Sequence, residues 1–343
     1  MRKAIFGAAL ALASVVAITP VTPVVAADKA ASAALLDYLH NQNSTGVLIV
    51  QDGKIVLEKY WAPPEGKSQA GLAYNLFVYG KAADGALLED VASQQKSFVA
   101  ILVAIALDKG LIDLDKPVSA YLKPGWSKAT PEQEAKIRVD DVLRMSSGLD
   151  EKFAYAAPAG SVFLYNTPVY AISKRIVEAA AGKPLDAVTQ EWLTAPIGMT
   201  NTAWRQRPGV LATVGNNTGL VTTPRDTALF GQMVLAQGVA ANGKRVVSAA
   251  NLAKLFEPAA TNPAYGRLWW LNNGAYALRA LSTRKEGPLI DAAPRDTVAA
   301  LGAFDRRLYV VPSRKLVIVR TGAAAGDKDF DQQFWLRLNK VLG

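Results

Sequence analysis

The stretch Glu89–Gly110, EDVASQQKSFVAILVAIALDKG, decides how this sequence is interpreted. Every residue from Phe98 to Leu107 is apolar, so a helix formed here has no polar face and is expected at the centre of the fold. Lys96 nevertheless stands at the start of this run, three residues after Ser93 and therefore on the same helix face. A buried ammonium group is costly, so this lysine requires a chemical reason.

A lysine in this position is a candidate general base. Burial disfavours the charged form, and a neutral amine beside the Ser93 hydroxyl can take its proton, while the helix N-terminus stabilises negative charge on the oxygen. The spacing S-x-x-K alone is weak, because it recurs at Ser282 and Lys285 in a polar stretch where the lysine is expected to stay solvated. Context therefore favours Ser93 as the nucleophile and Lys96 as its base.

The composition excludes several other kinds of active site. The 343 residues include no cysteine and one histidine, which rules out a thiol nucleophile, a disulfide framework and a histidine-rich metal centre. That histidine, His40, is expected on the surface or at the end of an N-terminal amphipathic helix, and no G-x-S-x-G motif occurs. We expect no metal and no cofactor. The net charge of +9 is scattered, which disfavours nucleic-acid binding.

The N-terminus has the order of a secretory signal. Arg2 and Lys3 precede the apolar run 4–18, and small residues follow up to Ala26. We expect residues 1–26 to be removed, leaving a periplasmic or secreted protein without stable membrane insertion. The alternative is a retained membrane anchor, although the run is short for a membrane span.

The remaining pattern predicts one α+β domain over residues 27–343. Two apolar runs around Asp52-Gly53 indicate a hairpin, and short strand signals return after residue 258. Helical signals dominate between these regions. We therefore expect an antiparallel sheet subdomain of residues 27–90 and 258–343 with an inserted helical subdomain of residues 91–257. Helix N-caps are predicted at Thr130, Thr167, Thr223 and Ser248.

Two further segments carry groups that acyl transfer needs. If Thr167 caps a helix, Tyr165 lies in the preceding loop, where its phenol can relay a proton to a leaving group, although a packed aromatic is the commoner use of tyrosine. An oxyanion needs two N–H donors, and the amides of Ser93 and of the strand at Gly302-Ala303 are candidates. The alternative for this glycine is a simple bulge.

Nine segments in the same order resemble the serine β-lactamase and penicillin-recognising superfamily, in its class C-like branch. That branch includes class C β-lactamases, D-alanyl-D-alanine carboxypeptidases, family VIII esterases and 6-aminohexanoate-dimer hydrolases. The segments are VLIVQDGKIVLEKY, SQQKSF, KGLIDLDKPVSAYL, DVLRMSSGL, the YNT segment, APIGMTNTAW, GLVTTPRDTALFGQMVLAQG, YGRLWW and LGAFDRRLYVVPSRKLVIVR. The resemblance implies a helical subdomain beside an antiparallel sheet flanked by helices.

The resemblance also implies roles for single residues. It makes Ser93 the acylated nucleophile, Lys96 its base and Tyr165 the residue that assists proton transfer. The region of Gly302 and Ala303 matches the strand that completes the oxyanion hole. The neighbouring Asn166 is a further candidate for substrate binding.

The sequence departs from the family pattern at two places. Many members have Tyr-x-Asn, whereas here Asn166 follows Tyr165 directly, and the cation of the family's third strand is missing from residues 301–305. Arg306 or Arg307 can substitute, but strand alternation points them to opposite faces, and exposure is the alternative.

We therefore predict an exported serine hydrolase acting on a small ester or amide, with β-lactams less expected. The alternatives are a D-alanyl-D-alanine carboxypeptidase or penicillin-binding protein, a β-lactamase, and a non-catalytic binding protein on the same fold. The acyl group, leaving group and oligomeric state stay open.

Overall fold

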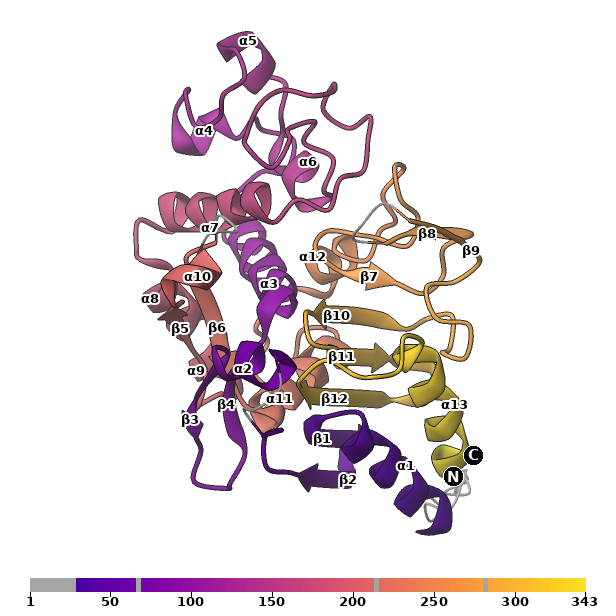
Figure 1. Cartoon of the computed structure of the whole chain (residues 1–343). Coiled ribbons are helices and arrows are strands. Elements are labelled where there is room, and N and C mark those ends of the chain that lie inside the picture. Colours follow the sequence, from indigo (N-terminus) through magenta and orange to yellow (C-terminus); the bar gives the residue numbers. More distant parts are fainter. Residues whose placement is uncertain (1–28, 66–68, 213–215, 280–282) are drawn as a thin grey trace, which may run out of the picture.

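The computed structural model describes residues 29–65, 69–212, 216–279 and 283–343. Its largest sheet joins the two ends of the chain (Figure 1). Six antiparallel strands follow the order β2-β1-β12-β11-β10-β7. They are β1 (Ser44–Gln51), β2 (Lys54–Tyr60), β7 (Trp270–Leu271), β10 (Val298–Gly302), β11 (Arg306–Val311) and β12 (Leu316–Gly322). The expected sheet of N- and C-terminal strands is confirmed.

The first two strands form the predicted hairpin. Asp52 and Gly53 have φ angles of +49° and +74°, so both central residues are left-handed. A turn of this kind matches the twist of the flanking strands, which explains the Asp-Gly pair.

Helices cover both faces of the large sheet. On β11, Tyr309 contacts Trp335 of α13 (Phe330–Leu342), and α1 (Lys29–Asn41) packs beside α13. Leu308, the neighbour of Tyr309, points the other way and lies against Gly231 of α11 (Pro224–Leu235). Every residue of β11 and β12 is buried, as expected for strands covered on both sides.

The apolar stretch forms the central helix α3 (Gln95–Asp108), as predicted. Its residues from Gln95 to Ala106 are all buried, and it contacts α7 (Thr167–Ala181), α12 (Ala249–Lys254) and β10. The left-handed Gly110, with φ of +66°, lies just beyond its end. A helix apolar on all sides is thus enclosed by both halves of the chain.

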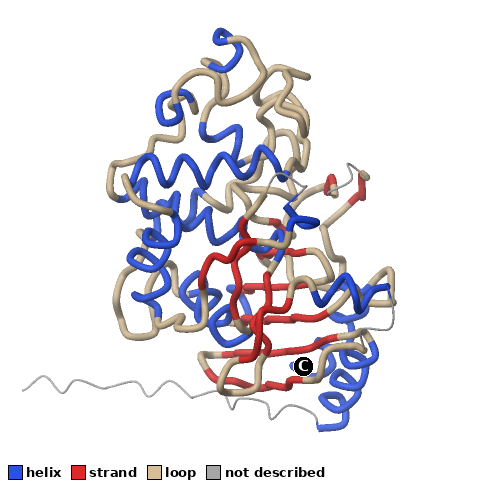
Figure 2. Tube along the Cα trace, turned by 60° about the vertical axis from the view of Figure 1, so that its left-hand side comes forward, coloured by secondary structure: helices blue, strands red, loops and turns tan. Residues whose placement is uncertain are grey.

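A second sheet was not predicted. It has four antiparallel strands in the order β3-β4-β6-β5, from β3 (Val78–Lys81), β4 (Leu87–Asp90), β5 (Ala203–Gln206) and β6 (Thr218–Thr222). Figure 1 shows β5 and β6 near α8 (Leu185–Thr189) and α9 (Ala195–Ile197), and Figure 2 shows that the helices gather mainly above the strands of the molecule. Residues 91–257, expected to be helical, therefore contribute two strands, and α11 packs on the large sheet. Strand β4 leads through the turn η1 (Ala92–Gln94) directly into α3.

Most predicted helix caps are confirmed. Thr130, Thr223 and Ser248 cap α5, α11 and α12. The prediction for Thr167 is wrong, because the Asn166 side chain accepts the Val169 amide and is the N-cap of α7. The other elements are α2 (Gln69–Asn75), α4 (Ser119–Leu122), α5 (Pro131–Glu134), α6 (Val139–Leu143), α8 (Leu185–Thr189), η2 (Gln190–Thr194), α9 (Ala195–Ile197), α10 (Gly209–Ala212), β8 (Tyr276–Leu278), β9 (Arg284–Glu286) and η3 (Pro312–Arg314).

The predicted signal, residues 1–26, lies outside the described residues. Within the described ranges, no helix combines the length and apolar character that a membrane crossing requires.

Candidate active site

The candidate nucleophile sits on a strained turn between β4 and α3. Ala92, just before Ser93, has φ of +51°, a conformation that costs an L-residue with a Cβ about 1–2 kcal/mol. The Ala92 amide donates to Asp90 Oδ1 over 2.8 Å, which holds the turn. Ser93 is half-buried and lines a cavity.

Lys96 reaches the Ser93 hydroxyl from the first turn of α3. Its Nζ donates to Ser93 Oγ over 3.0 Å and to Thr167 Oγ1 over 3.2 Å, and the residue is only 2% exposed. Burial, followed by the positive charge of Arg207, lowers the pKa of Lys96 to about 7. Much of this lysine is therefore neutral at neutral pH, and its free amine can accept the Ser93 proton along the same contact.

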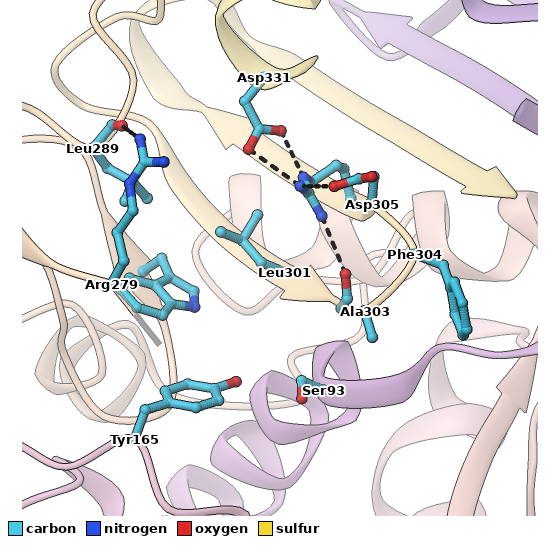
Figure 3. Close-up of a pocket in the computed structure, with 12 residues that line it drawn as sticks. Ser93, Tyr165, Arg279, Leu289, Leu301, Ala303, Phe304, Asp305 and Asp331 are labelled. Atoms are coloured by element: carbon cyan, nitrogen blue, oxygen red, sulfur yellow. Dashed lines mark hydrogen bonds and ion pairs between the residues drawn. The ribbon is translucent and has the colours of Figure 1, made fainter. Parts of the chain in front are cut away.

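Two tyrosine rings flank the amine. Lys96 Nζ lies 5.0 Å from the ring centre of Tyr165 and 4.7 Å from that of Tyr170. Tyr165 also stacks on Trp270 with 5.6 Å between ring centres. Figure 3 shows the phenol of Tyr165 pointing toward Ser93. Burial raises the pKa of Tyr165 to about 12, against the opposing effect of its hydrogen bond with Ser93, so the phenol holds its proton at neutral pH.

The end of β10 lies directly against the nucleophile turn. A Cβ added to Gly302 would be 2.3 Å from Val91 O and 3.3 Å from the Gln94 amide, so only glycine permits this approach. Ala303, the next residue, lines the cavity together with Ser93. The close approach brings the backbone of a distant strand beside the nucleophile.

The cavity has a volume of about 340 Å³ and opens to the surface. Apolar and charged residues both line it, with Asp331 and Asp305 on one side of the view and Tyr165 and Ser93 on the other (Figure 3). Its lining consists of Ser93, Tyr165, Trp270, Arg279, Leu289, Leu301, Gly302, Ala303, Phe304, Asp305, Arg307 and Asp331.

The charge of Arg307 is neutralised within the cavity wall. Its Nε donates to Asp331 Oδ1 over 2.6 Å and its Nη2 to Asp305 Oδ1 over 2.7 Å. Its Nη1 donates to the Gly302 carbonyl over 3.1 Å, so the side chain supports the end of β10. Arg306 points to the opposite face, as alternation predicts, and pairs with buried Glu89 over 3.1 Å. Neither arginine is exposed, so that alternative is wrong.

Arg279 is a second cation of the cavity lining, besides Arg307, and the sequence did not predict it. It is exposed, and its Nη2 donates to the Leu289 carbonyl over 3.4 Å. It follows β8 and lies on the same side of the cavity as Tyr165 (Figure 3).

The comparisons with known proteins agree with this architecture. A family model described as beta-lactamase matches residues 32–340, most of the chain. The chain belongs to the beta-lactamase family. An uncharacterized protein of Alkalihalophilus pseudofirmus is 24% identical over 318 residues, covering 84% of this chain and 86% of that protein.

Solved structures show the same fold. A class C beta-lactamase matches with a TM-score of 0.66 and 16% identity over 92% of this chain and 96% of that one. A family VIII carboxylesterase matches with a TM-score of 0.62 and 14% identity, over 91% and 96% of the two chains. The beta-lactamase/transpeptidase-like fold expected from the sequence is confirmed, and the chain is a member of a family of serine hydrolases that includes esterases and amidases.

Most of the site residues predicted from the sequence lie close together in the structure. Ser93, Lys96, Tyr165, Gly302 and Ala303 meet around the cavity or contact a residue that lines it.

Asn166 does not join this group. It is buried, with Oδ1 accepting the Val169 amide and Nδ2 donating to the Leu149 carbonyl, so its side chain caps α7 and is absent from the cavity lining. Thr167 lies beside Lys96 instead, since its hydroxyl accepts a hydrogen bond from Lys96 Nζ. The sequence signal for this placement was the position of Thr167 two residues after Tyr165.

The other candidates lie elsewhere. His40 is exposed in the last turn of α1, stacks on Trp61 and does not line the cavity. Ser282 lies outside the described residues, and Lys285 donates to the Pro288 carbonyl and pairs with Asp291.

Proposed function

We propose that this protein is a serine hydrolase that cleaves ester or amide bonds through an acyl-enzyme on Ser93. One observation carries the proposal: a buried lysine places its Nζ 3.0 Å from the hydroxyl of a serine that opens to a cavity. Family membership supports the same class of reaction.

In the proposed acylation step, neutral Lys96 removes the proton from Ser93 Oγ, which forms a bond to the substrate carbonyl carbon. The carbonyl oxygen becomes an oxyanion, for which the backbone amides of Ser93 and Ala303 are the proposed donors. The approach of Gly302 to the nucleophile turn supports this pair, because it brings the end of β10 to Ser93.

Collapse of the intermediate then breaks the bond to the leaving group. Tyr165 donates its proton to the departing oxygen or nitrogen and regains one from the Lys96 ammonium. Water then attacks the acyl carbon while Lys96 takes its proton. The bond between this carbon and Ser93 Oγ breaks, Lys96 returns the proton to Ser93 Oγ, and the carboxylic acid leaves. The protonation states of the two side chains suit these roles, since a large fraction of Lys96 is neutral and Tyr165 is protonated near pH 7.

We rank small carboxylic esters first as substrates, then linear amides, with β-lactams third. Residues 301–303, at the end of β10, include no cationic residue that could bind a β-lactam carboxylate. Nearby Arg307 is already paired with two carboxylates. The proposal also places the mature protein in the periplasm or outside the cell, on the signal-like pattern of residues 1–26.

The test is hydrolysis of p-nitrophenyl butyrate by the purified mature protein and two serine variants. We expect Ser93→Ala to lose about 10⁴-fold or more of the activity. Ser282→Ala, which removes the serine of the other S-x-x-K match, should retain it. Mass spectrometry should find the acyl group on the peptide containing Ser93. A wild-type protein with neither turnover nor adduct would favour a non-catalytic binding protein on this fold.

A further inference from the structure

A buried ion pair lies behind the nucleophile, outside the cavity. Arg207 Nε donates to Asp90 Oδ2 over 2.7 Å and Nη2 to Asp90 Oδ1 over 2.9 Å, with side chains 6% and 0% exposed. Two parallel hydrogen bonds fix both the distance and the orientation of the partners. The pair joins the last residue of β4 to the residue that follows β5, which are 117 positions apart.

The same carboxylate reaches the nucleophile turn. Asp90 Oδ1 also accepts the amide of Ala92, the left-handed residue immediately before Ser93. The carboxylate fits here because residue 219 of β6 is a glycine. A Cβ added to Gly219 would lie 1.9 Å from Asp90 Oδ2. One chain of contacts thus runs from Arg207 through Asp90 and Ala92 to Ser93.

Stability alone does not account for this arrangement. Apolar residues of similar volume often stabilise a fold as well as a buried ion pair does, while a left-handed alanine is itself unfavourable. From the geometry we infer that the Asp90–Arg207 pair is a positioning device, which holds Ala92 in its left-handed conformation and thereby fixes the Ser93 hydroxyl against Lys96. The inference rests on the proposed role of Ser93.

Arg207 has a second effect, through its charge. After burial, it is the main group that lowers the pKa of Lys96. The titratable groups around this lysine are Tyr165, Tyr170, Lys174, Arg207 and Asp90. Loss of the arginine charge therefore raises the pKa of Lys96 and moves the acid limb of activity to higher pH, whereas lysine at position 207 keeps the charge.

The decisive experiment combines Asp90→Asn with Ala92→Gly. Fluorophosphonate labelling counts the intact Ser93 sites, and p-nitrophenyl butyrate hydrolysis is expressed per labelled site. Asparagine cannot accept all three N–H groups, so we expect Asp90→Asn to lower kcat per site about 10–100-fold. Glycine adopts positive φ without a clamp, so the double variant should recover at least about 3-fold of that loss. Wild-type turnover per site in Asp90→Asn, or no recovery in the double variant, overturns the inference.

Arg207 variants test the same role even if Asp90→Asn does not fold. Arg207→Lys keeps the charge but loses the second parallel bond, so kcat per site should fall about 3–10-fold with an unshifted pH midpoint. Arg207→Gln should shift the midpoint to higher pH. Unchanged kcat in Arg207→Lys together with an unshifted midpoint in Arg207→Gln refutes the role.

The Ser93→Ala variant separates the two proposals. Activity in that variant defeats the proposed function. An inactive Ser93→Ala beside a fully active Asp90→Asn defeats the positioning role alone.

Discussion

Lys96 and Lys174 occupy the same part of the molecule, yet of the two only Lys96 contacts Ser93, the proposed nucleophile. Both are buried, with 2% and 6% exposed, and burial is the main cause that lowers the pKa of each. Lys96 contacts two hydroxyls, those of Ser93 and Thr167. Lys174 donates to Asn216 Oδ1 over 2.7 Å and to both the carbonyl and the hydroxyl of Thr218.

The difference lies in what the partners can do. A hydroxyl both donates and accepts, whereas a carbonyl oxygen only accepts. Lys96 can therefore lose a proton and stay hydrogen-bonded, with the serine proton now directed toward nitrogen. The carbonyl partners of Lys174 have no proton to give, and the hydroxyl that it contacts belongs to Thr218, which does not line the cavity. Burial lowers the pKa of a lysine, and the hydrogen-bond partner determines whether the neutral amine has a proton to accept.

The largest effect should separate the two lysines directly. We expect Lys96→Met to reduce kcat/KM for p-nitrophenyl butyrate about 10³–10⁴-fold, because the general base is lost. The matched variant Lys174→Met should stay within about 3-fold of wild type per labelled site, since it contacts neither Ser93 nor the cavity. Equal losses in the two variants would show that the comparison is false.

The pH dependence of wild-type activity tests the same point without mutation. The pKa of Lys96 is lowered from 10.5 to about 7. In the proposed mechanism the neutral form of this lysine is the active one. Activity should therefore rise with pH through about 7 and reach a plateau above it, with kcat/KM at pH 5 about 100-fold below the plateau. Lys174→Met should keep this midpoint. A flat profile between pH 5 and 8 would contradict a lysine base.

A second matched pair tests the proton donor. Tyr165 and Tyr170 are about equally close to Lys96, but the Tyr170 hydroxyl has no hydrogen-bond partner among the described residues. We expect Tyr165→Phe to slow hydrolysis of an anilide about 10–100-fold, because its amine must leave protonated. The effect on p-nitrophenyl butyrate should be much smaller, since p-nitrophenolate leaves as an anion. Tyr170→Phe should affect neither substrate, and an equal effect of both variants would count against Tyr165.

The smallest effect concerns Arg279. Because this exposed cation lies on the Tyr165 side of the cavity, it should favour a leaving group that carries a carboxylate (Figure 3). We expect Arg279→Gln to lower the ratio of kcat/KM for 4-(butyryloxy)benzoate over 4-(butyryloxy)benzamide about 5-fold or less. The benzamide serves as the uncharged control, and an unchanged ratio would remove Arg279 from substrate selection.

The sequence predicted those parts of the fold that depend on local patterns. The apolar run of α3, the Asp52-Gly53 turn and the strands β10 to β12 each carry a signal within a few residues. The four-stranded sheet has no such signal, since its strands are four or five residues long and its β4–β6 pairing joins segments about 130 positions apart. Alternation placed Arg306 and Arg307 on opposite faces, but their burial depends on distant carboxylates.

The candidate site divides in the same way. Ser93 and Lys96 were found because three-residue spacing brings them to one helix face beside an apolar run. Asn166 and Thr167 were assigned each other's positions, because both side chains cap helices well and the local sequence does not choose between them. Which of the two side chains caps α7 and which contacts Lys96 depends on where Lys96 lies in the folded chain. No sequence pattern predicted Arg279 as a cavity residue, since the other residues that line the cavity are far from it in sequence, apart from Trp270 and Leu289.

The pairing of β1 with β12 also determines when the large sheet can be completed during synthesis. Ser44 lies opposite Gly322, so β1 cannot pair with β12 until β12 has been synthesised. Ser93 and Ala303 are likewise brought together across some 210 positions. Contacts of such long range form slowly, and a chain emerging from the ribosome cannot bring Ala303 to Ser93 until residue 303 has been made. Under the proposed function, this order of assembly keeps Ser93 without its second oxyanion donor during synthesis.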